Sequence, residues 1–256
     1  MTLPVSITSR SNSSMLDLRF GMLFIQITTL LLLLTAVPAS VAQNMSTLIK
    51  PSLKVQHVTT DFAISDLSNA QWKKGELVAV SRYWSGAEAP KGRRFSFRLL
   101  WSKTALYVRF EANQEEPLVV SDKPDLTKKA INLWDRDVCE IFVAPDIKEP
   151  KKYFEFEVAP TGEWLDVALD LTSGTRISDW DYASRMESFA RIESGKVVMA
   201  IKIPWSAFGK TPKAGDVWLG NLLRCVGRDP DRGYLAWQPT FTKEPAFHVP
   251  EKFGEF

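Results

Sequence analysis

Cysteine and histidine are scarce in this 256-residue chain, which holds two of each. Two histidines are too few to suggest a zinc site, and no Ser or Cys lies in a motif of a catalytic nucleophile. The 32 basic and 30 acidic residues nearly balance, so no basic surface for nucleic acid is indicated. Because the chain has nine Trp, fifteen Phe and five Tyr, it is neither a small disulfide scaffold nor a disordered tail. A globular protein remains.

Long apolar runs are confined to the first 44 residues. Arg10 and Arg19 precede a nearly uninterrupted apolar run from Met22 to Val37, which small residues follow up to Ala42. This pattern predicts a secretory signal peptide over residues 1–42. We therefore expect a mature chain of residues 43–256 that is secreted or periplasmic.

Two features of this leader leave alternatives to weigh. A start at Met15 would give it an ordinary length, and the sequence leaves the choice of initiator open. The competing interpretation is a membrane anchor, but a bilayer span needs roughly 20 apolar residues. The run from Met22 to Val37 is shorter than that, and Gln26 interrupts it. Cleavage, with no stable membrane span afterwards, is the favoured interpretation.

Secretion would allow Cys139 and Cys225 to form the one disulfide that two cysteines permit. Both lie in apolar runs, where a free buried cysteine packs well as a small hydrophobic residue. The sequence leaves this pairing open.

Helical periodicity is also missing, since no segment keeps an amphipathic helical pattern over three turns. Short alternating runs closed by Gly, Pro, Asn or Asp predict strands instead. They cover residues 94–101, 105–111, 137–144, 152–159, 164–170, 186–193, 196–203 and 216–226. We expect an all-β protein, an antiparallel β-sandwich of jelly-roll or immunoglobulin-like type with about eight to ten strands, as one domain over residues 43–256. Pro204–Phe208 predicts a single helical turn.

The segment from Tyr153 to Val167 predicts a hairpin whose first strand has an apolar face and a face that carries Glu155 and Glu157. If residues 160–163 form a four-residue loop, Glu157 lies opposite Asp166. Two carboxylates facing each other across a ladder repel, so a Lys, an Arg or a bound Ca²⁺ is expected nearby unless the pair is exposed.

Glutamates and aspartates in pairs raise the question of catalysis. Glycoside hydrolysis needs an acid together with a base or nucleophile, and Glu140, Glu155, Glu157 and Asp166 could supply them. Nothing in the sequence marks one of these carboxyls as buried with a raised pKa. We therefore expect binding rather than catalysis, with a hydrolase acting on O-glycosyl bonds as the enzymatic alternative.

Several motifs along the chain resemble those of family 9-like carbohydrate-binding modules, which are relatives of the DOMON-type β-sandwiches. The motifs appear in the family's order over nearly the whole mature chain. They are Leu99–Trp101 with Ala105–Val108, Trp134–Phe142, Tyr153–Val158, Asn221–Arg224, Trp237–Thr240 and Phe247–Gly254. The resemblance implies a β-sandwich that binds an oligosaccharide or a polysaccharide.

By this resemblance, Trp134 and Trp237 would form a slot that holds a terminal sugar. Glu140 would accept hydrogen bonds from hydroxyl groups, and Asn221 and Arg224 would add further polar contacts. General chemistry agrees, because pyranose rings pack their C–H faces on aromatic rings while carboxylates, amides and Arg bind hydroxyls.

The resemblance also brings departures and alternatives. Cys139 stands where a small or polar residue is expected before the motif glutamate. Calcium ions accompany some members, but their ligands cannot be mapped onto this chain, so Ca²⁺ is the one cofactor left open. Some DOMON-like sandwiches bind haem through Met and His or Lys. The candidate haem ligands in this chain are His57, His248, Met186 and Met199.

Together these observations predict a secreted, non-catalytic carbohydrate-binding domain that contributes to carbohydrate catabolism. Family members often occur fused to glycoside hydrolases, so a separate hydrolase is the expected protein partner. A haem-binding electron-transfer domain and an accessory part of a glycoside hydrolase are the alternatives.

Overall fold

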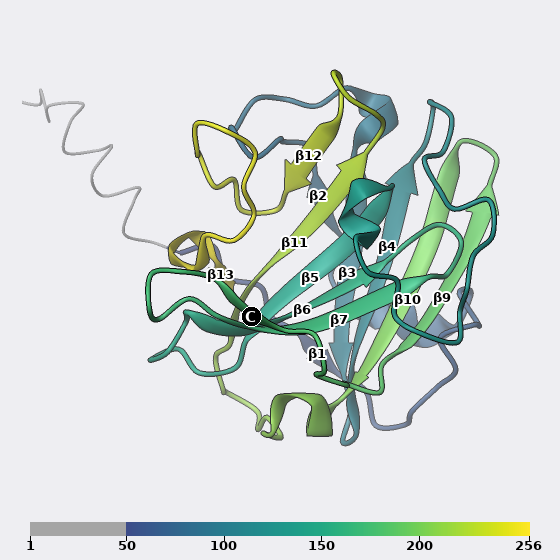
Figure 1. Cartoon of the computed structure of the whole chain (residues 1–256). Coiled ribbons are helices and arrows are strands. Elements are labelled where there is room, and N and C mark those ends of the chain that lie inside the picture. The colour runs from purple at the N-terminus through teal and green to yellow at the C-terminus, as the bar shows by residue number, and fades with distance from the viewer. Residues whose placement is uncertain (1–49) are drawn as a thin grey trace, which may run out of the picture. The chain divides into compact units, whose positions relative to one another are not determined.

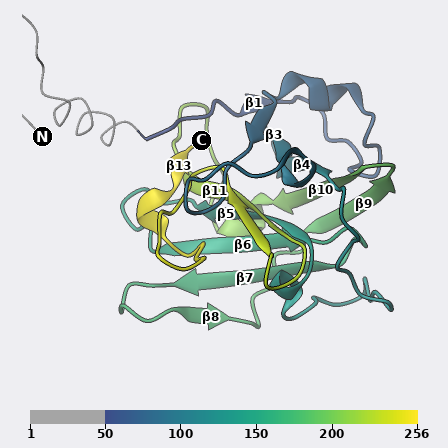
Figure 2. The ribbon, with the colours of Figure 1, turned by 90° about the horizontal axis from the view of Figure 1, so that it is seen from above.

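Strands are the main regular secondary structure of the protein, whose computed structural model describes residues 50–256. The signal peptide expected over residues 1–42 lies outside this range. Within the described range there is no α-helix, and no helix could cross a membrane. The strands form two facing sheets (Figures 1 and 2). The predicted all-β sandwich is thereby confirmed.

The first sheet, sheet I, has six strands in the order β1-β3-β4-β10-β9, with β2 beside β3. Its pairings are antiparallel except that β1 runs parallel to β3. The strands are β1 (Gln56–His57), β2 (Val78–Val80), β3 (Phe95–Trp101), β4 (Ala105–Asn113), β9 (Glu187–Glu193) and β10 (Lys196–Pro204).

The second sheet, sheet II, has seven strands in the order β12-β11-β5-β6-β7-β8, with β13 beside β11. All its pairings are antiparallel. The strands are β5 (Val138–Ala144), β6 (Lys152–Val158), β7 (Trp164–Asp170), β8 (Ile177–Asp179), β11 (Leu219–Val226), β12 (Gly233–Ala236) and β13 (Gly254–Glu255).

Short 3-10 helices lie between the strands. They are η1 (Ala70–Lys74), η2 (Lys91–Arg93), η3 (Leu133–Asp135), η4 (Trp205–Phe208) and η5 (Pro250–Lys252). The helical turn predicted over Pro204–Phe208 is η4, with Pro204 as its N-terminal cap.

Buried apolar side chains form three clusters because both sheets are covered on both faces. The main core lies between the sheets and takes side chains from β3, β4 and β10 on one side and from β5, β6 and β11 on the other. A second cluster covers the outer face of sheet II beneath Leu133, Phe247 and Phe253. A third covers the outer face of sheet I beneath the segment from Val58 to Trp72. Alternate side chains of each central strand therefore enter different clusters.

The two cysteines are free and enter different clusters. Cys139 packs in the core between the sheets, whereas Cys225 packs on the outer face of sheet II. The ladder places Cys139 opposite Arg224 rather than Cys225. The disulfide that the sequence left open does not form in this structure.

The β6–β7 hairpin has a different register from the one we predicted. The ladder is shifted by one residue, because Val158 rather than Ala159 lies opposite Trp164 and the Ala159 amide donates to the Glu163 carbonyl at 2.9 Å. Glu157 consequently lies opposite Leu165, and Asp166 lies opposite Phe156. The predicted pairing of Glu157 with Asp166 is therefore wrong.

Candidate functional site

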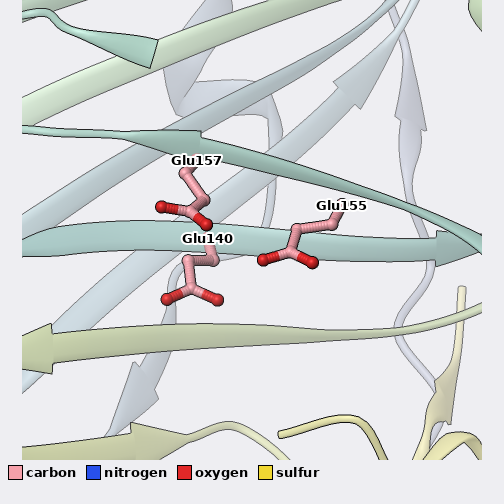
Figure 3. Close-up of side chains that lie close together, drawn as sticks. All are labelled: Glu140, Glu155 and Glu157. Carbon is pink, nitrogen blue, oxygen red and sulfur yellow. The ribbon is translucent and has the colours of Figure 1, made fainter. Parts of the chain in front are cut away.

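Three glutamates meet on the outer face of sheet II. Glu140 lies in β5 directly opposite Glu157 in β6, and Glu155 lies two residues before Glu157 on the same face. Their carboxylates converge on one place (Figure 3). One carboxylate oxygen from each residue lies within 4.8 Å of the others. We call these three residues the acidic triad.

The acidic triad is shielded from solvent. Glu140 is 2% exposed, Glu155 is 5% exposed and Glu157 is 0% exposed. Desolvation raises the pKa of each carboxyl above its ordinary range, and the proximity of the other carboxylates raises it further for Glu140 and Glu157. Burial at this level is the property that the sequence could not reveal.

Hydrogen-bond partners for the triad are few. The Cys225 thiol donates to Oε1 of Glu140 over 3.4 Å, and both oxygens of Glu157 lack a partner among the described residues. None of the salt bridges between described residues involves the triad. This part of the face therefore has acceptor capacity that the chain itself does not satisfy.

Two tryptophans pack together beside the triad. Trp134, in η3, stacks at a tilt of 32° on Trp180, with 5.9 Å between ring centroids. Trp180 is 41% exposed, and the side chain of Asp135, the next residue of η3, is also exposed. The charge of Asp135 acts on Glu157, which places η3 close to the triad. Figure 1 shows η3 as a short coil in front of sheet II.

Arg232 holds η3 in place. Its guanidinium donates to the backbone carbonyls of Trp134 and Arg136, each at 2.6 Å, and lies 5.6 Å from the centre of the Tyr234 ring. Tyr234 in turn packs edge-on against half-buried Trp84, with 6.1 Å between centroids. Together with Trp180, aromatic side chains from four separate segments thus gather over the same face as the triad.

The sequence predicted a slot between Trp134 and Trp237, but the structure places these residues on opposite faces of sheet II. Trp237 packs edge-on against Phe97 of sheet I, with 5.8 Å between centroids, and belongs with the core between the sheets. Gly254 leaves room for it, since a Cβ there would lie 2.6 Å from the Trp237 ring. Trp134 belongs with the outer cluster.

Asn221 and Arg224, the other predicted polar contacts, are buried and already bonded within the chain. The Asn221 amide donates to the Gln238 carbonyl at 2.9 Å and accepts from the Gln238 amide at 2.9 Å. Arg224 points between the sheets and donates to the carbonyls of Arg93 and Asn113, each at 2.7 Å. Of the five predicted site residues, Glu140 belongs to the triad and Trp134 to the aromatic group near it. Asn221 and Arg224 are bonded within the chain, and Trp237 faces the core between the sheets.

Asp166, which we grouped with the triad glutamates from the sequence, lies on the other face of β7. Lys129 pairs with it at 2.7 Å, but the Glu157–Asp166 pair for which a compensating cation was expected does not exist. Asp166 faces away from the triad because the observed register places it opposite Phe156, which packs in the core between the sheets.

The candidate haem ligands do not gather in one place. Met186 and Met199 lie in the core between the sheets, whereas His248 lies beside Phe142 and Tyr153 of the outer cluster. His57 packs against Trp101 of sheet I.

Trp180, Trp84, Tyr234 and Arg232 are site residues that the sequence analysis did not identify. Trp180 follows the three-residue strand β8, and no periodic pattern marks the segment that carries it. An aromatic residue within two positions of a glycine or an aspartate was the signal that could have pointed to Trp84, Trp180 and Tyr234, and it does not apply to Arg232.

Comparison with known proteins identifies the family. Residues 65–256 match the family described as carbohydrate family 9 binding domain-like. No curated protein matches the chain significantly.

Solved structures share the fold. A candidate carbohydrate-binding protein from Bacteroides uniformis has a TM-score of 0.64 and 18% identity, with 81% of this chain and 98% of that chain covered. A family 9 carbohydrate-binding module from Caldicellulosiruptor kristjanssonii in complex with cellotriose has a TM-score of 0.55 and 17% identity, covering 79% and 92%. The same organism's module in complex with glucose has a TM-score of 0.54 and 17% identity, covering 79% and 94%. Because the family match spans most of the chain, this protein belongs to the carbohydrate family 9 binding domain-like family.

Proposed function

We propose that this protein is a secreted, non-catalytic carbohydrate-binding domain that contributes to carbohydrate catabolism beside a separate glycoside hydrolase. The observation that carries the proposal is the gathering of aromatic side chains on the outer face of sheet II, around buried carboxylates, in a chain of this family. Secretion rests on the leader pattern of residues 1–42.

The Trp134–Trp180 pair is the proposed platform for a sugar ring. A slot would need its two aromatic rings roughly 7–8 Å apart, twice the ordinary carbon contact distance, to admit a pyranose between them. At 5.9 Å the two tryptophans pack on each other instead. The sugar would therefore lie on the exposed face of Trp180, with its C–H groups against the indole.

Polar contacts to the sugar would come from the rim of the site. Glu140 is too deeply buried to accept a hydroxyl hydrogen bond directly. The carboxylate of Asp135 is exposed beside Trp134, so we assign the direct acceptor role to Asp135 and a supporting role to Glu140. Burial of the triad also supports binding over hydrolysis, because no glycosidic bond can reach carboxylates that solvent does not reach.

A glycan panel that includes glucose and cello-oligosaccharides, measured by titration calorimetry, tests the proposal. We expect Trp180→Ala to weaken the binding of the best ligand by at least tenfold, because removing an aromatic platform costs more than 1 kcal/mol. Ile192→Ala is the matched control, since Ile192 is an exposed apolar residue in β9 of the other sheet, 56% exposed.

Two results would contradict this assignment. Unchanged affinity in folded Trp180→Ala would show that Trp180 is not the platform. A larger loss of affinity in Trp237→Ala than in Trp180→Ala would instead support the predicted slot between Trp134 and Trp237. Detection of the protein only in the cytoplasmic fraction of its source cells would refute secretion.

A further inference from the structure

We propose that a cavity between the ends of the two sheets binds a small aromatic anion, that is, a molecule with an aromatic ring and a carboxylate or sulfonate group. None of the residues that line this cavity belongs to the acidic triad or to the aromatic side chains gathered beside it. The inference therefore does not depend on the proposed carbohydrate site.

A segment near the start of the described chain spans the gap between the sheets. The Leu53 amide donates to the carbonyl of Glu255 in β13 of sheet II at 2.8 Å, and β1, which begins three residues later, pairs with β3 of sheet I. Residues 212–218, which lead into β11, form a second wall. The cavity lined by both has a volume of about 450 Å³, and small-molecule sites typically have about 300–1,000 Å³. It is therefore large enough for a small ligand.

Aromatic side chains form much of the lining. Trp205 packs edge-on against Trp218, with 5.7 Å between ring centroids, and Trp101 packs edge-on against His57, with 4.4 Å between centroids. Phe256 adds a further ring. Three of the nine tryptophans of the chain thus line one cavity, and aromatic rings attract the ring of a ligand through edge-on or offset contacts. These walls favour an aromatic ligand over a flexible polar one.

Free positive charges at the cavity favour an anionic ligand. Lys54 lies on the spanning segment and Lys213 on the second wall, and both residues are exposed. No acidic group of a described residue forms a salt bridge with either ammonium group. Asp216 is the one acidic side chain in the lining, and its carboxylate accepts from the Lys213 amide at 2.9 Å. An anion in the cavity would therefore find unpaired lysines on two separate walls.

The indole N–H of Trp218 is a further unsatisfied donor. It is buried and has no acceptor among the described residues, whereas the indole N–H of Trp205 donates to the Ser102 carbonyl at 3.0 Å. A buried donor without a partner is unfavourable and points to a partner outside the chain. A ligand with acceptor oxygens offers such a partner, which a purely apolar ligand does not.

Titration of the purified full chain with 8-anilinonaphthalene-1-sulfonate, a fluorescent aromatic anion, tests the proposal at pH 7.5. We expect one probe per chain, with enhanced probe fluorescence and energy transfer from tryptophan. trans-Cinnamate should displace the probe, whereas cinnamyl alcohol, which has the same ring and chain but no charge, should bind about tenfold more weakly. The near-ultraviolet circular dichroism is recorded in parallel and should stay native, because the probe also binds loosened folds.

Two variants separate charge from shape. Lys54→Glu combined with Lys213→Glu should weaken probe binding by about tenfold or more, because two attractive charges become repulsive. Lys73→Glu combined with Lys74→Glu is the matched control, since both lysines are exposed in η1 and do not line the cavity. It changes the net charge equally and should alter the affinity by less than about twofold. Val55→Trp, which enlarges a lining side chain, should weaken binding by about tenfold with both lysines intact.

Absence of probe binding would overturn the proposal, and so would an unchanged affinity in either folded variant. Displacement of the probe by glucose or cello-oligosaccharides would overturn it as well, because the cavity would then bind a sugar. Loss of the signal on self-association would show that a second copy of the chain covers the cavity instead. Trp180→Ala should bind the probe as the parent does, so failure of this titration leaves the glycan panel above unaffected.

Discussion

Replacement of Arg224 by methionine tests the role that the structure gives this residue against the one that its sequence motif implied. Arg224 is 2% exposed, and its guanidinium connects β11 of sheet II to Arg93, two residues before β3, and to the last residue of β4 in sheet I. Besides the carbonyls of Arg93 and Asn113, it donates to the side-chain oxygen of Gln114 at 2.6 Å. Arg224 is thus a polar connection between the two sheets.

The magnitude follows from these bonds. A hydrogen bond to a charged group contributes about 1.5–3 kcal/mol, and removal of one partner leaves buried carbonyls unsatisfied. Methionine fills part of the volume but donates no hydrogen bond. With three such bonds lost and the cost of burying the guanidinium removed as well, we expect Arg224→Met to lower the free energy of unfolding by about 3–5 kcal/mol.

Urea unfolding followed by tryptophan fluorescence measures this change. With an m value of about 2–3 kcal/mol/M, the midpoint should fall by about 1–2.5 M. Arg82→Met is the control, because Arg82 pairs with Glu88 on the surface with 60% and 57% exposed side chains, and it should change stability by less than about 0.5 kcal/mol. A loss below about 1 kcal/mol in Arg224→Met, together with loss of glycan binding, would refute the structural role and favour a ligand contact.

Three further predictions follow from close packing and burial. Gly254→Ala should destabilise the fold by about 1–3 kcal/mol, because its Cβ would lie 2.6 Å from the Trp237 ring, and a lowered thermal midpoint measures this. Burial lowers the pKa of His248 to about 3, with the charge of Arg176 adding to the effect. The fold therefore favours the neutral imidazole. The stability that this preference contributes is complete above about pH 6.5 and is lost as the pH falls toward 3. Urea midpoints of His248→Asn should fall less steeply than those of the parent over that window, and parallel profiles would contradict the reasoning. Cys139 and Cys225 should react with a thiol reagent only after unfolding, with two free thiols per chain, and a non-reducing gel shift would contradict this.

The long strands could be predicted because each has enough residues for its alternation to show. The run from Trp164 to Asp170 is a strand with unchanged bounds, and the run predicted at 137–144 is β5, which begins one residue later. Five strands of two to four residues, β1, β2, β8, β12 and β13, were not predicted, because so few residues cannot display a period.

The candidate site was predictable only in part, because small offsets decide which face a side chain occupies. Alternation placed Glu155 and Glu157 on one face correctly, but a one-residue shift in the register of the hairpin put Asp166 on the other face. Trp237 follows the unpredicted strand β12, and its position directly after Ala236 turns it toward the core between the sheets. Trp134 and Glu140 were proposed from their motif and stay predicted site residues, whereas the position of Trp180 depends on the path of a loop.

The strands at the rims of the two sheets bear on how the protein behaves at high concentration. The rim strand β9 of sheet I carries Glu187, Arg191 and Glu193, and charges along an unpaired backbone edge disfavour the addition of a strand from another molecule. The rim strand β8 of sheet II has only three residues, so it presents little backbone for such pairing. Exposed Ile177 of β8 and Ile192 of β9 are apolar exceptions on these edges. Substitutions that neutralise β9 would therefore favour self-association before they affect the fold itself.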